Sequence, residues 1–393
     1  MLEQKNKILF AIEEISQQMA TLARAIHAQP ELSFAEHHAS AALQAPLQAA
    51  GFSVTRGVAG LKTAFRARLD SGKPGPHVAL LAEYDALPEL GHACGHNLIG
   101  TASVAAAVAL ATSGTLQSGV LEVIGTPAEE EGGGKIIMAD NGVFSGIDAV
   151  MMFHPREKNM MTRGALACVD ATFKFYGKAS HAASAPHLGI SALDAVIQTF
   201  VGINALRQFF TDDVRVHGII THGGSATNIV PAYAEAKFLM RATSVSGLQT
   251  VRSKVFAAAQ GAAAMSGARL EIEEGLTYAE RNNNLTLAGL FQANLEQLGL
   301  AAEAAPERGG VGSSDIGNVS QLTAAIHPYL RIGDVIPHTP EFAVAAASDR
   351  GIEAMLNAAR ALAMTTLDLQ QADTLKNVRN EFLAWQSSVS QEK

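Results

Sequence analysis

The chain has 393 residues, of which 48% are hydrophobic and 17% are charged. This length exceeds what one hydrophobic core usually supports, so it favours two domains. The formal net charge of −8, with no basic run, argues against a nucleic-acid partner held through its phosphates.

The start of the chain predicts an amphipathic helix over residues 1–26 rather than a signal peptide, because charges interrupt its apolar positions. The Ala-rich stretch from Ala102 to Thr112 is too short to span a bilayer, so we expect no membrane partner. Two cysteines, Cys94 and Cys168, cannot form a disulfide framework. We therefore expect a reducing, cytoplasmic location.

Three short apolar runs predict buried parallel strands, and each leads into a polar cluster. The runs are Val78–Ala82, Leu121–Gly125 and Ala149–Phe153, and they lead into Glu83–Asp85, Glu129–Glu130 and His154. Because ligands bind at the carboxyl ends of the strands in open α/β sheets, we expect these clusters to converge. Between them, Asn97–Thr112 is apolar on nearly every face and predicts a buried helix.

The middle of the chain predicts a second domain inserted into the first. Its elements follow the order strand, helix, strand, strand, helix, strand at Asp170–Tyr176, Ser191–Phe210, Arg215–Thr221, Ala234–Ala242, Gly247–Met265 and Arg269–Glu273. This is the order of a ferredoxin-like α+β sandwich. We expect it to occupy residues 168–281. Residues 1–167 and 282–393 would form an α/β catalytic domain with a mixed, mostly parallel sheet flanked by helices.

The segment Gly91–Asn97 reads Gly-His-Ala-Cys-Gly-His-Asn. A thiolate at Cys94 and an imidazole at His96, in a turn bordered by glycines, can bind one soft or borderline cation without strain. A buried cysteine beside a surface histidine is the alternative interpretation.

The segment Thr126–Lys135 puts three carboxylates at a strand end, followed by three glycines. Their repulsion is relieved if one carboxylate binds a metal while its neighbour acts as a general base. A solvated acidic helix N-terminus explains the same residues, because the helix dipole favours negative charge there.

Two isolated histidines bring the number of candidate metal donors to five, although a lone histidine after an apolar strand is more often a hydrogen-bonded core or rim residue. His154 follows an apolar strand, and His338 lies in a turn bracketed by Pro337 and Pro340, which would hold its imidazole in one direction. Together with Cys94, His96 and Glu130 they suit two metals that share a bridging ligand and keep open positions for water and substrate.

Five motifs resemble, in family order, the aminoacylase/glutamate-carboxypeptidase family of co-catalytic metallopeptidases. They are Ala82–Pro88, Gly91–Asn97, Pro127–Glu130, Met152–Pro155 and His338–Phe342. The motifs are most similar to those of the amidohydrolase branch, which includes hydrolases of hippurate, indole-3-acetyl-amino acids and p-aminobenzoyl-glutamate, and a β-alanyl-lysine dipeptidase. The resemblance covers His27 to Phe342 and implies hydrolysis of the amide bond in small N-acyl amino acids or dipeptide-like substrates.

Residue by residue, the resemblance implies a cysteine-bridged centre of two divalent ions, zinc or manganese. The implied ligands are Cys94 as the bridge, with His96, Glu130, His154 and His338. Glu129 matches the general base that takes a proton from the attacking water. Asp85 matches a carboxylate that holds a ligand in place. Other branches carry a histidine ligand where this chain has Glu83, and we do not expect Glu83 to bind metal.

The inserted domain resembles the lid of this family, which implies a homodimer or a higher homo-oligomer. His181 matches the histidine that stabilises the tetrahedral oxyanion, often from a dimer partner. Asn228 matches an asparagine that contacts substrate, and Gly312 opens a glycine-rich segment near the substrate carboxylate. Arg241 lies where related enzymes hold that carboxylate with a guanidinium, although a solvated strand face also explains it.

Two alternatives to a broad acyl-amino acid hydrolase stay open. One is a dipeptidase specific for free dipeptides, such as those with basic C-terminal residues. The other is a catalytically silent metal-binding scaffold on the same fold, although Glu129 beside Glu130 counts against it. The chain lacks the Gly-x-Ser-x-Gly elbow of many serine hydrolases, so nothing favours that class.

Overall fold

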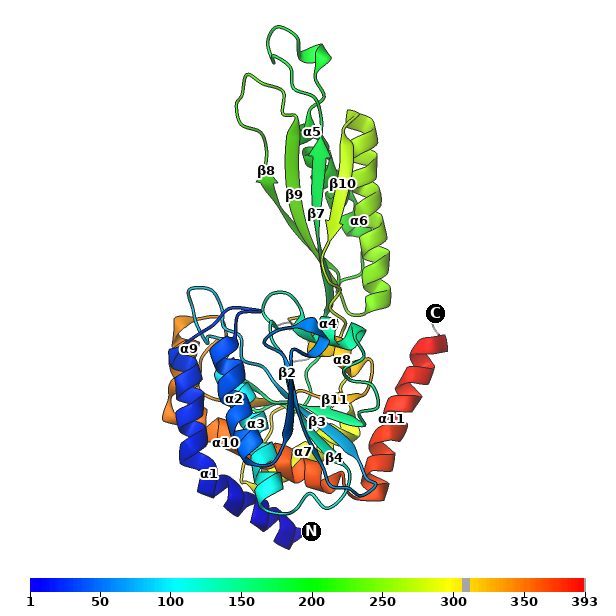
Figure 1. Cartoon of the computed structure of the whole chain (residues 1–393). Helices are drawn as coiled ribbons and strands as arrows, with labels where there is room; N and C mark the ends of the chain where they lie inside the picture. Colours follow the sequence, from blue (N-terminus) through cyan, green and yellow to red (C-terminus); the bar gives the residue numbers. More distant parts are fainter. Residues whose placement is uncertain (306–311, 392–393) are drawn as a thin grey trace. The chain divides into compact units, whose positions relative to one another are not determined.

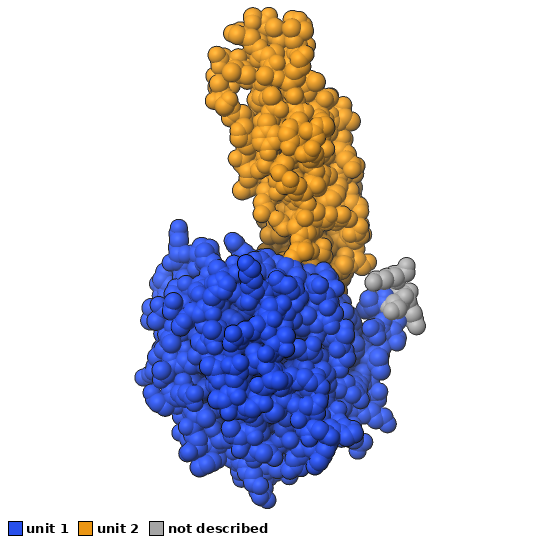
Figure 2. All heavy atoms as spheres, in the orientation of Figure 1, with its two compact units in different colours: residues 1–164, 281–311, 315–393 blue, residues 165–280, 312–314 orange. Residues whose placement is uncertain are grey.

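The computed structural model describes residues 1–305 and 312–391, and the chain divides into two compact units (Figures 1 and 2). The first unit comprises Met1–Gly164, Arg281–Val311 and Asp315–Lys393. The second unit comprises Ala165–Glu280 and the short segment Gly312–Ser314. The boundaries therefore fall after residues 164 and 280, where the sequence predicts 167 and 281, and Gly312 goes with the second unit.

The first unit contains a six-stranded sheet with the order β1-β2-β4-β3-β5-β11. Its strands are β1 Ser53–Arg56, β2 Phe65–Asp70, β3 His77–Ala82, β4 Val120–Gly125, β5 Ala149–Met151 and β11 Ala324–Ile326. Strands β4, β3, β5 and β11 run parallel, and β2 runs antiparallel to both of its neighbours. The predicted mixed, mostly parallel sheet is confirmed. A separate two-stranded parallel ladder joins β6 (His154–Arg156) to β12 (Tyr329–Arg331).

The register of the sheet brings three strand ends together. Ala82 pairs with Gly125, and Leu80 pairs with Met151, so the segments that leave β3, β4 and β5 emerge at the same edge. These are the segments that carry the polar clusters after each predicted strand.

Helices flank the sheet of the first unit (Figure 1). They are α1 Leu2–Ala28, α2 His37–Ala49, α3 His96–Thr112, α4 Gly134–Asp140, α7 Leu285–Gln297, α8 Ile316–Ser320, α9 Pro340–Ala347, α10 Asp349–Asp368 and α11 Ala372–Gln391. Helix α3 packs on β3 and β4 and is covered in turn by α1 and α10. Every α3 side chain from His96 to Leu110 is buried, which explains its lack of a polar face. Among the described helices, none combines the length and apolarity that crossing a bilayer requires.

The second unit is a four-stranded antiparallel sheet, in the order β10-β7-β9-β8, with two helices. Its elements are β7 Ala167–Tyr176, α5 Ala192–Leu206, β8 Arg215–His222, β9 Tyr233–Ala242, α6 Val245–Ser266 and β10 Arg269–Glu274. Ser191 and Ser244 cap the two helices by accepting hydrogen bonds from backbone N–H groups. The predicted ferredoxin-like order is confirmed. Helix α5 ends at Leu206, before the predicted Phe210, and a short 3-10 turn follows it.

Candidate metal centre

Cys94 and His96 come from the turn that opens α3. Gly95 between them has a left-handed φ of 77°, and a Cβ built there would lie 2.5 Å from Cγ of Pro155. Only glycine therefore lets this turn approach the segment that carries His154. His96 is the first residue of α3 and is fully buried.

Two groups of donor atoms share the thiol of Cys94. One contains Cys94, His96 and His154, and the other contains Cys94, Glu130 and His338, with the ligand atoms of each group within 4.8 Å of one another. Sγ of Cys94 lies 3.4 Å from Nε2 of His154, and Oε2 of Glu130 lies 3.6 Å from Nε2 of His338. The structure thus brings together all five ligands that the resemblance implies. The atom that the two groups share, Sγ of Cys94, is the one that the resemblance implies as the bridge between the two metals.

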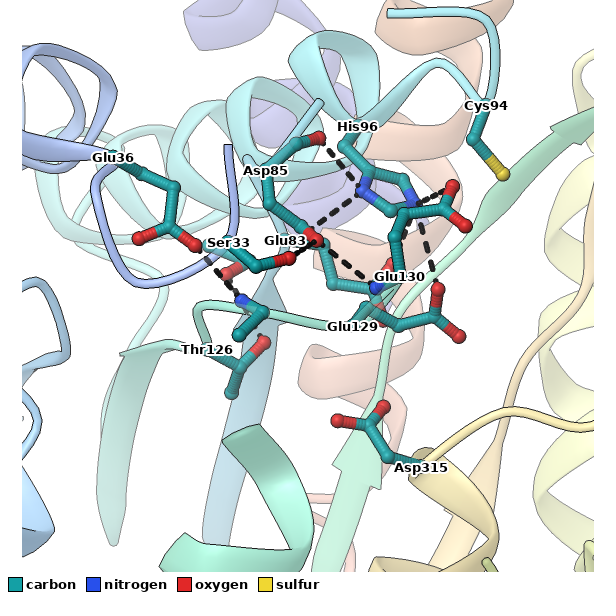
Figure 3. A network of polar contacts seen from close by, with 12 residues as sticks. Ser33, Glu36, Glu83, Asp85, Cys94, His96, Thr126, Glu129, Glu130 and Asp315 are labelled. Carbon is teal, nitrogen blue, oxygen red and sulfur yellow. Dashed lines mark hydrogen bonds and ion pairs between the residues drawn. The ribbon is translucent and has the colours of Figure 1, made fainter. Parts of the chain in front are cut away.

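Hydrogen bonds fix which ring nitrogen of His96 and of His154 faces the centre. Nδ1 of His96 donates to Oδ1 of Asp85 at 3.0 Å (Figure 3). Nδ1 of His154 donates to the carbonyl of Pro155 at 2.8 Å. Both bonds leave Nε2 as the nitrogen available to a metal. Asp85 therefore orients the imidazole of His96, which the resemblance implies to be a metal ligand. His338 is held through its backbone N–H, which donates to the carbonyl of Ala93 at 2.9 Å.

The loop that carries Glu129 and Glu130 is held from both sides. Oδ2 of Asp85 accepts a hydrogen bond from the backbone N–H of Glu130 at 3.0 Å. Oε1 of the buried Glu36 accepts one from the N–H of Ala128 at 2.9 Å. Ala128 has a left-handed φ of 60°, an uncommon conformation for alanine that turns the chain just before Glu129.

Burial and neighbouring charges shift the pKa values of this centre. Burial raises the pKa of Asp85, but the positive charge and hydrogen bond of His96 lower it to about 2. Burial raises the pKa of Glu129, and the charges of Glu83, Glu130 and Asp315 raise it further. Burial and Glu130 also raise the pKa of the Cys94 thiol.

These donors fit a pair of divalent cations. Nε2 of His96 and Oε1 of Glu130 are buried and have no hydrogen-bond partner among the described residues. Buried polar atoms without a partner are costly, and metal coordination would satisfy both of them. A thiol, imidazoles and a carboxylate also form a donor set typical of zinc and of neighbouring transition metals.

A buried ion cluster beside Glu129 was not predicted from the sequence. The ammonium of Lys135 lies 2.6 Å from Glu83 and 2.7 Å from Asp315, and all three side chains are buried. Lys135 and Asp315 are 180 positions apart, so no local pattern links them. The contact of Glu36 with Ala128 was not predicted from the sequence for the same reason. The only available signal for Lys135 was a lone cation directly after the glycines of the acidic segment.

The four predicted residues of the second unit fall into two pairs. His181 and Asn228 lie together, because the N–H of Ala182 donates to the carbonyl of Asn228 at 3.0 Å. Nδ1 of His181 accepts hydrogen bonds from the N–H groups of Ala183 and Ser184, so the ring proton is on Nε2.

The other pair lies at the opposite end of the same sheet. Arg241 pairs with Cys168 near the start of β7, and the carbonyl of Gly312 accepts from Leu166 at 2.9 Å. His181 and Asn228 lie beyond Tyr176, at the other end of β7. The ten residues of β7 span about 30 Å. Within one chain, these residues therefore do not form one substrate site.

Comparison with known proteins identifies relatives along most of the chain. Residues 164–264 match the M20 peptidase dimerisation domain. The chain is 40% identical to a mouse Xaa-Arg dipeptidase over 96% of this chain and 92% of that protein. It is 38% identical to one of the subunits of the Escherichia coli p-aminobenzoyl-glutamate hydrolase, over 74% of this chain and 64% of that subunit.

Solved structures share the fold at lower identity. A dinuclear metal-binding peptidase of the M20 family from Bacillus subtilis superposes with a TM-score of 0.70 at 20% identity, covering 91% of this chain and 99% of that one. An aminobenzoyl-glutamate utilisation protein from Klebsiella pneumoniae gives a TM-score of 0.74 at 20% identity, with 91% and 97% covered. Given these relatives and the donor set around Cys94, the chain belongs to the M20 family and is a metal-dependent hydrolase of amide bonds.

Proposed function

We propose that this hydrolase is a dipeptidase that cleaves dipeptides with a basic C-terminal residue, and that Cys94 bridges two divalent ions at its active site. The observation that carries the catalytic part is the pair of donor groups that share Cys94, with Glu129 next to ligand Glu130. The substrate is suggested by the 40% identity to an Xaa-Arg dipeptidase along nearly the full length of both chains.

In the proposed reaction Glu129 carries the proton and His181 binds the oxyanion. The metal pair, when bound, acidifies a water molecule and polarises the scissile carbonyl. Glu129 takes a proton from the attacking water as its oxygen bonds to the carbonyl carbon. Nε2–H of His181 donates to the resulting oxyanion. Glu129 then gives its proton to the amide nitrogen as the C–N bond breaks, so the products are a carboxylic acid and an amine.

The base is tested by Glu129→Gln, with Glu131→Gln as a matched control on the exposed neighbouring carboxylate. Loss of a general base typically costs about a hundredfold to ten-thousandfold in rate. We expect Glu129→Gln to lose at least about a hundredfold in kcat while metal content stays at the wild-type level. Glu131→Gln should keep both. Unchanged hydrolysis by Glu129→Gln would mean that another group is the base.

A second substrate class is p-aminobenzoyl-glutamate, because the Escherichia coli hydrolase subunit is 38% identical. The two classes are separated by kcat/KM for alanyl-arginine, p-aminobenzoyl-glutamate and hippurate, measured on one preparation. We expect alanyl-arginine to be preferred by at least about tenfold, which corresponds to about 1.4 kcal/mol in transition-state binding. A preference for either acyl-amino acid would replace the dipeptidase assignment.

The choice of metal can be argued from the types of ligand atoms. One thiolate with imidazoles and a carboxylate suits zinc by softness, whereas manganese prefers oxygen ligands. We propose zinc first and manganese second. Elemental analysis of protein purified without added metal, followed by activity after exchange to each ion, distinguishes them. A free thiolate as the shared ligand also suits a reducing compartment, which supports a cytoplasmic location.

We also propose a homodimer formed through β8 and α5. Strand β8 is at the edge of its sheet, and Ile219 on it is 64% exposed. Helix α5 exposes Ile197 and Val201. Pairing of two β8 strands would extend the sheet and cover these side chains. Ile219→Glu should shift the sedimentation coefficient from that of a dimer to that of a monomer, and a wild-type monomer would contradict the interface.

A further inference from the structure

Lys135 fastens the end of the loop that carries Glu129 and Glu130. Its backbone N–H donates to Oδ2 of Asp315 at 2.9 Å, and its ammonium donates to Oδ1 of the same carboxylate at 2.7 Å. One carboxylate therefore holds both the main chain and the side chain of Lys135. The ammonium also lies 2.6 Å from Oε1 of Glu83, at the end of β3.

The two ends of the loop between Ala128 and Lys135 are held against each other. The N–H of Gly134 donates to the carbonyl of Ala128 at 3.1 Å. A Cβ at Gly134 would lie 1.9 Å from the carbonyl oxygen of Pro127, so the two ends of the loop are in close contact. A shift of Lys135 is therefore transmitted to the backbone next to Glu129.

The charges of the neighbouring carboxylates also indicate a role for Lys135. Oxygen atoms of Glu83, Glu129 and Asp315 lie within 4.8 Å of one another, and Figure 3 shows Asp315 below Glu129. Three carboxylates this close repel one another unless a cation lies among them. The ammonium of Lys135 contacts two of the three, and neither contact reaches solvent. In this cluster a side chain supplies the positive charge that bound metal ions would supply in the neighbouring donor groups.

We infer that Lys135, clamped by Asp315, is a positioning residue that fixes the backbone next to Glu129 and so holds the Glu129 carboxylate against the repulsion of Glu83. It acts through the loop and through its charge, and it does not touch the reacting atoms. The inference rests on the proposed role of Glu129 as the base.

The test begins with Asp315→Asn, the least disruptive change. An amide offers only one acceptor oxygen, so it can keep one of the two hydrogen bonds from Lys135 but not both. The second variant is Lys135→Met combined with Asp315→Asn, which removes the clamp and leaves one buried carboxylate, Glu83, without its cation instead of two. Lys158→Met is the matched control, because Lys158 makes a similar ion pair with Glu303 on the surface.

Three quantities are measured for each variant: kcat and KM with alanyl-arginine, and zinc affinity by titration calorimetry of the metal-free protein. We expect Asp315→Asn to lower kcat by about tenfold or more, with KM and zinc affinity within about threefold of wild type. The double variant should lose at least as much, and Lys158→Met should match wild type. A smaller loss of kcat in Asp315→Asn, or a fall in zinc affinity as large as the fall in kcat, overturns the inference.

Failure of the inference is distinguishable from failure of the proposed function. If Glu129→Gln is inactive while Asp315→Asn is fully active, only the positioning role is wrong. If Glu129→Gln keeps its activity, the assignment of the base is wrong, and the role of Lys135 falls with it.

Discussion

Two residues of the metal centre hold an unfavourable backbone conformation. Ala128 and His338 have φ angles of 60° and 65°, in the left-handed region that costs a non-glycine residue about 1 kcal/mol or more. Each is held by a specific hydrogen bond: Ala128 by the carboxylate of Glu36, and His338 by the carbonyl of Ala93. One turn directs the side chain of Glu129, which directly follows Ala128, and the other directs the side chain of His338. Both side chains point toward the candidate metal centre.

Glu36→Ala is predicted to destabilise the protein and to loosen the turn before Glu129. It leaves the N–H of Ala128 buried without its acceptor, which costs about 1–3 kcal/mol in the free energy of unfolding. Urea denaturation measures this change. Glu36→Gln keeps an acceptor oxygen and should lose clearly less. Equal stability of Glu36→Ala and wild type would show that Glu36 does not hold the turn.

At the scale of elements, periodicity predicted what local sequence can encode. Apolar runs gave β3 and β4 to within one residue, and the uniformly apolar stretch gave α3. The three-residue strands β6 and β12 carry no period, so only their parallel pairing in space reveals them. The five ligand candidates came from motifs and meet in one centre. The contacts of Glu36 with Ala128, and of Lys135 with Asp315, join distant segments and could not be predicted.

The sheet itself contains a charge that makes its stability depend on pH. The side chain of Glu122 on β4 is fully buried and pairs with Arg66 and Arg68 on β2 and with His77 on β3. Burial raises the pKa of Glu122, but the hydrogen bonds of His77 and Arg66 lower it below its ordinary value. A carboxyl with a lowered pKa in the folded state stabilises the protein above its unfolded pKa of about 4.3 and loses this contribution as pH falls further.

Glu122→Gln should therefore be less stable than wild type at neutral pH, and the difference should shrink as pH falls below about 4.3. Free energies of unfolding in urea, measured for both proteins across this range, test the prediction. A difference that does not change with pH would mean that packing, rather than the ion pairs, accounts for the role of Glu122.

At the scale of the whole molecule, the second unit separates residues that the sequence assigns to one substrate site. Arg241 and Gly312 lie at one end of its sheet, and His181 and Asn228 lie at the other. A motif shows the chemistry of a residue but not the end of the domain at which it lies. The separation is consistent with the proposed dimer, in which His181 and Asn228 would serve the partner's active site.

Mixing two inactive variants tests this exchange between subunits. His181→Ala lacks the oxyanion donor, and Glu129→Gln lacks the base. If His181 acts on the partner's site, each mixed dimer has one complete site. Random exchange in a symmetric dimer should then restore about a quarter of the wild-type activity. No recovery, with mixed dimers verified by mass spectrometry, would mean that His181 acts within its own chain.

The shared thiolate is the central feature of the proposed centre, and counting metal ions tests it most directly. The measurement is the zinc content per chain of Cys94→Ala, with Cys168→Ala as the control at the other buried cysteine. Because Cys94 belongs to both donor groups, its removal should empty both positions, while Cys168→Ala should keep the full wild-type content. A Cys94→Ala protein that is folded and keeps both ions would contradict a cysteine-bridged centre.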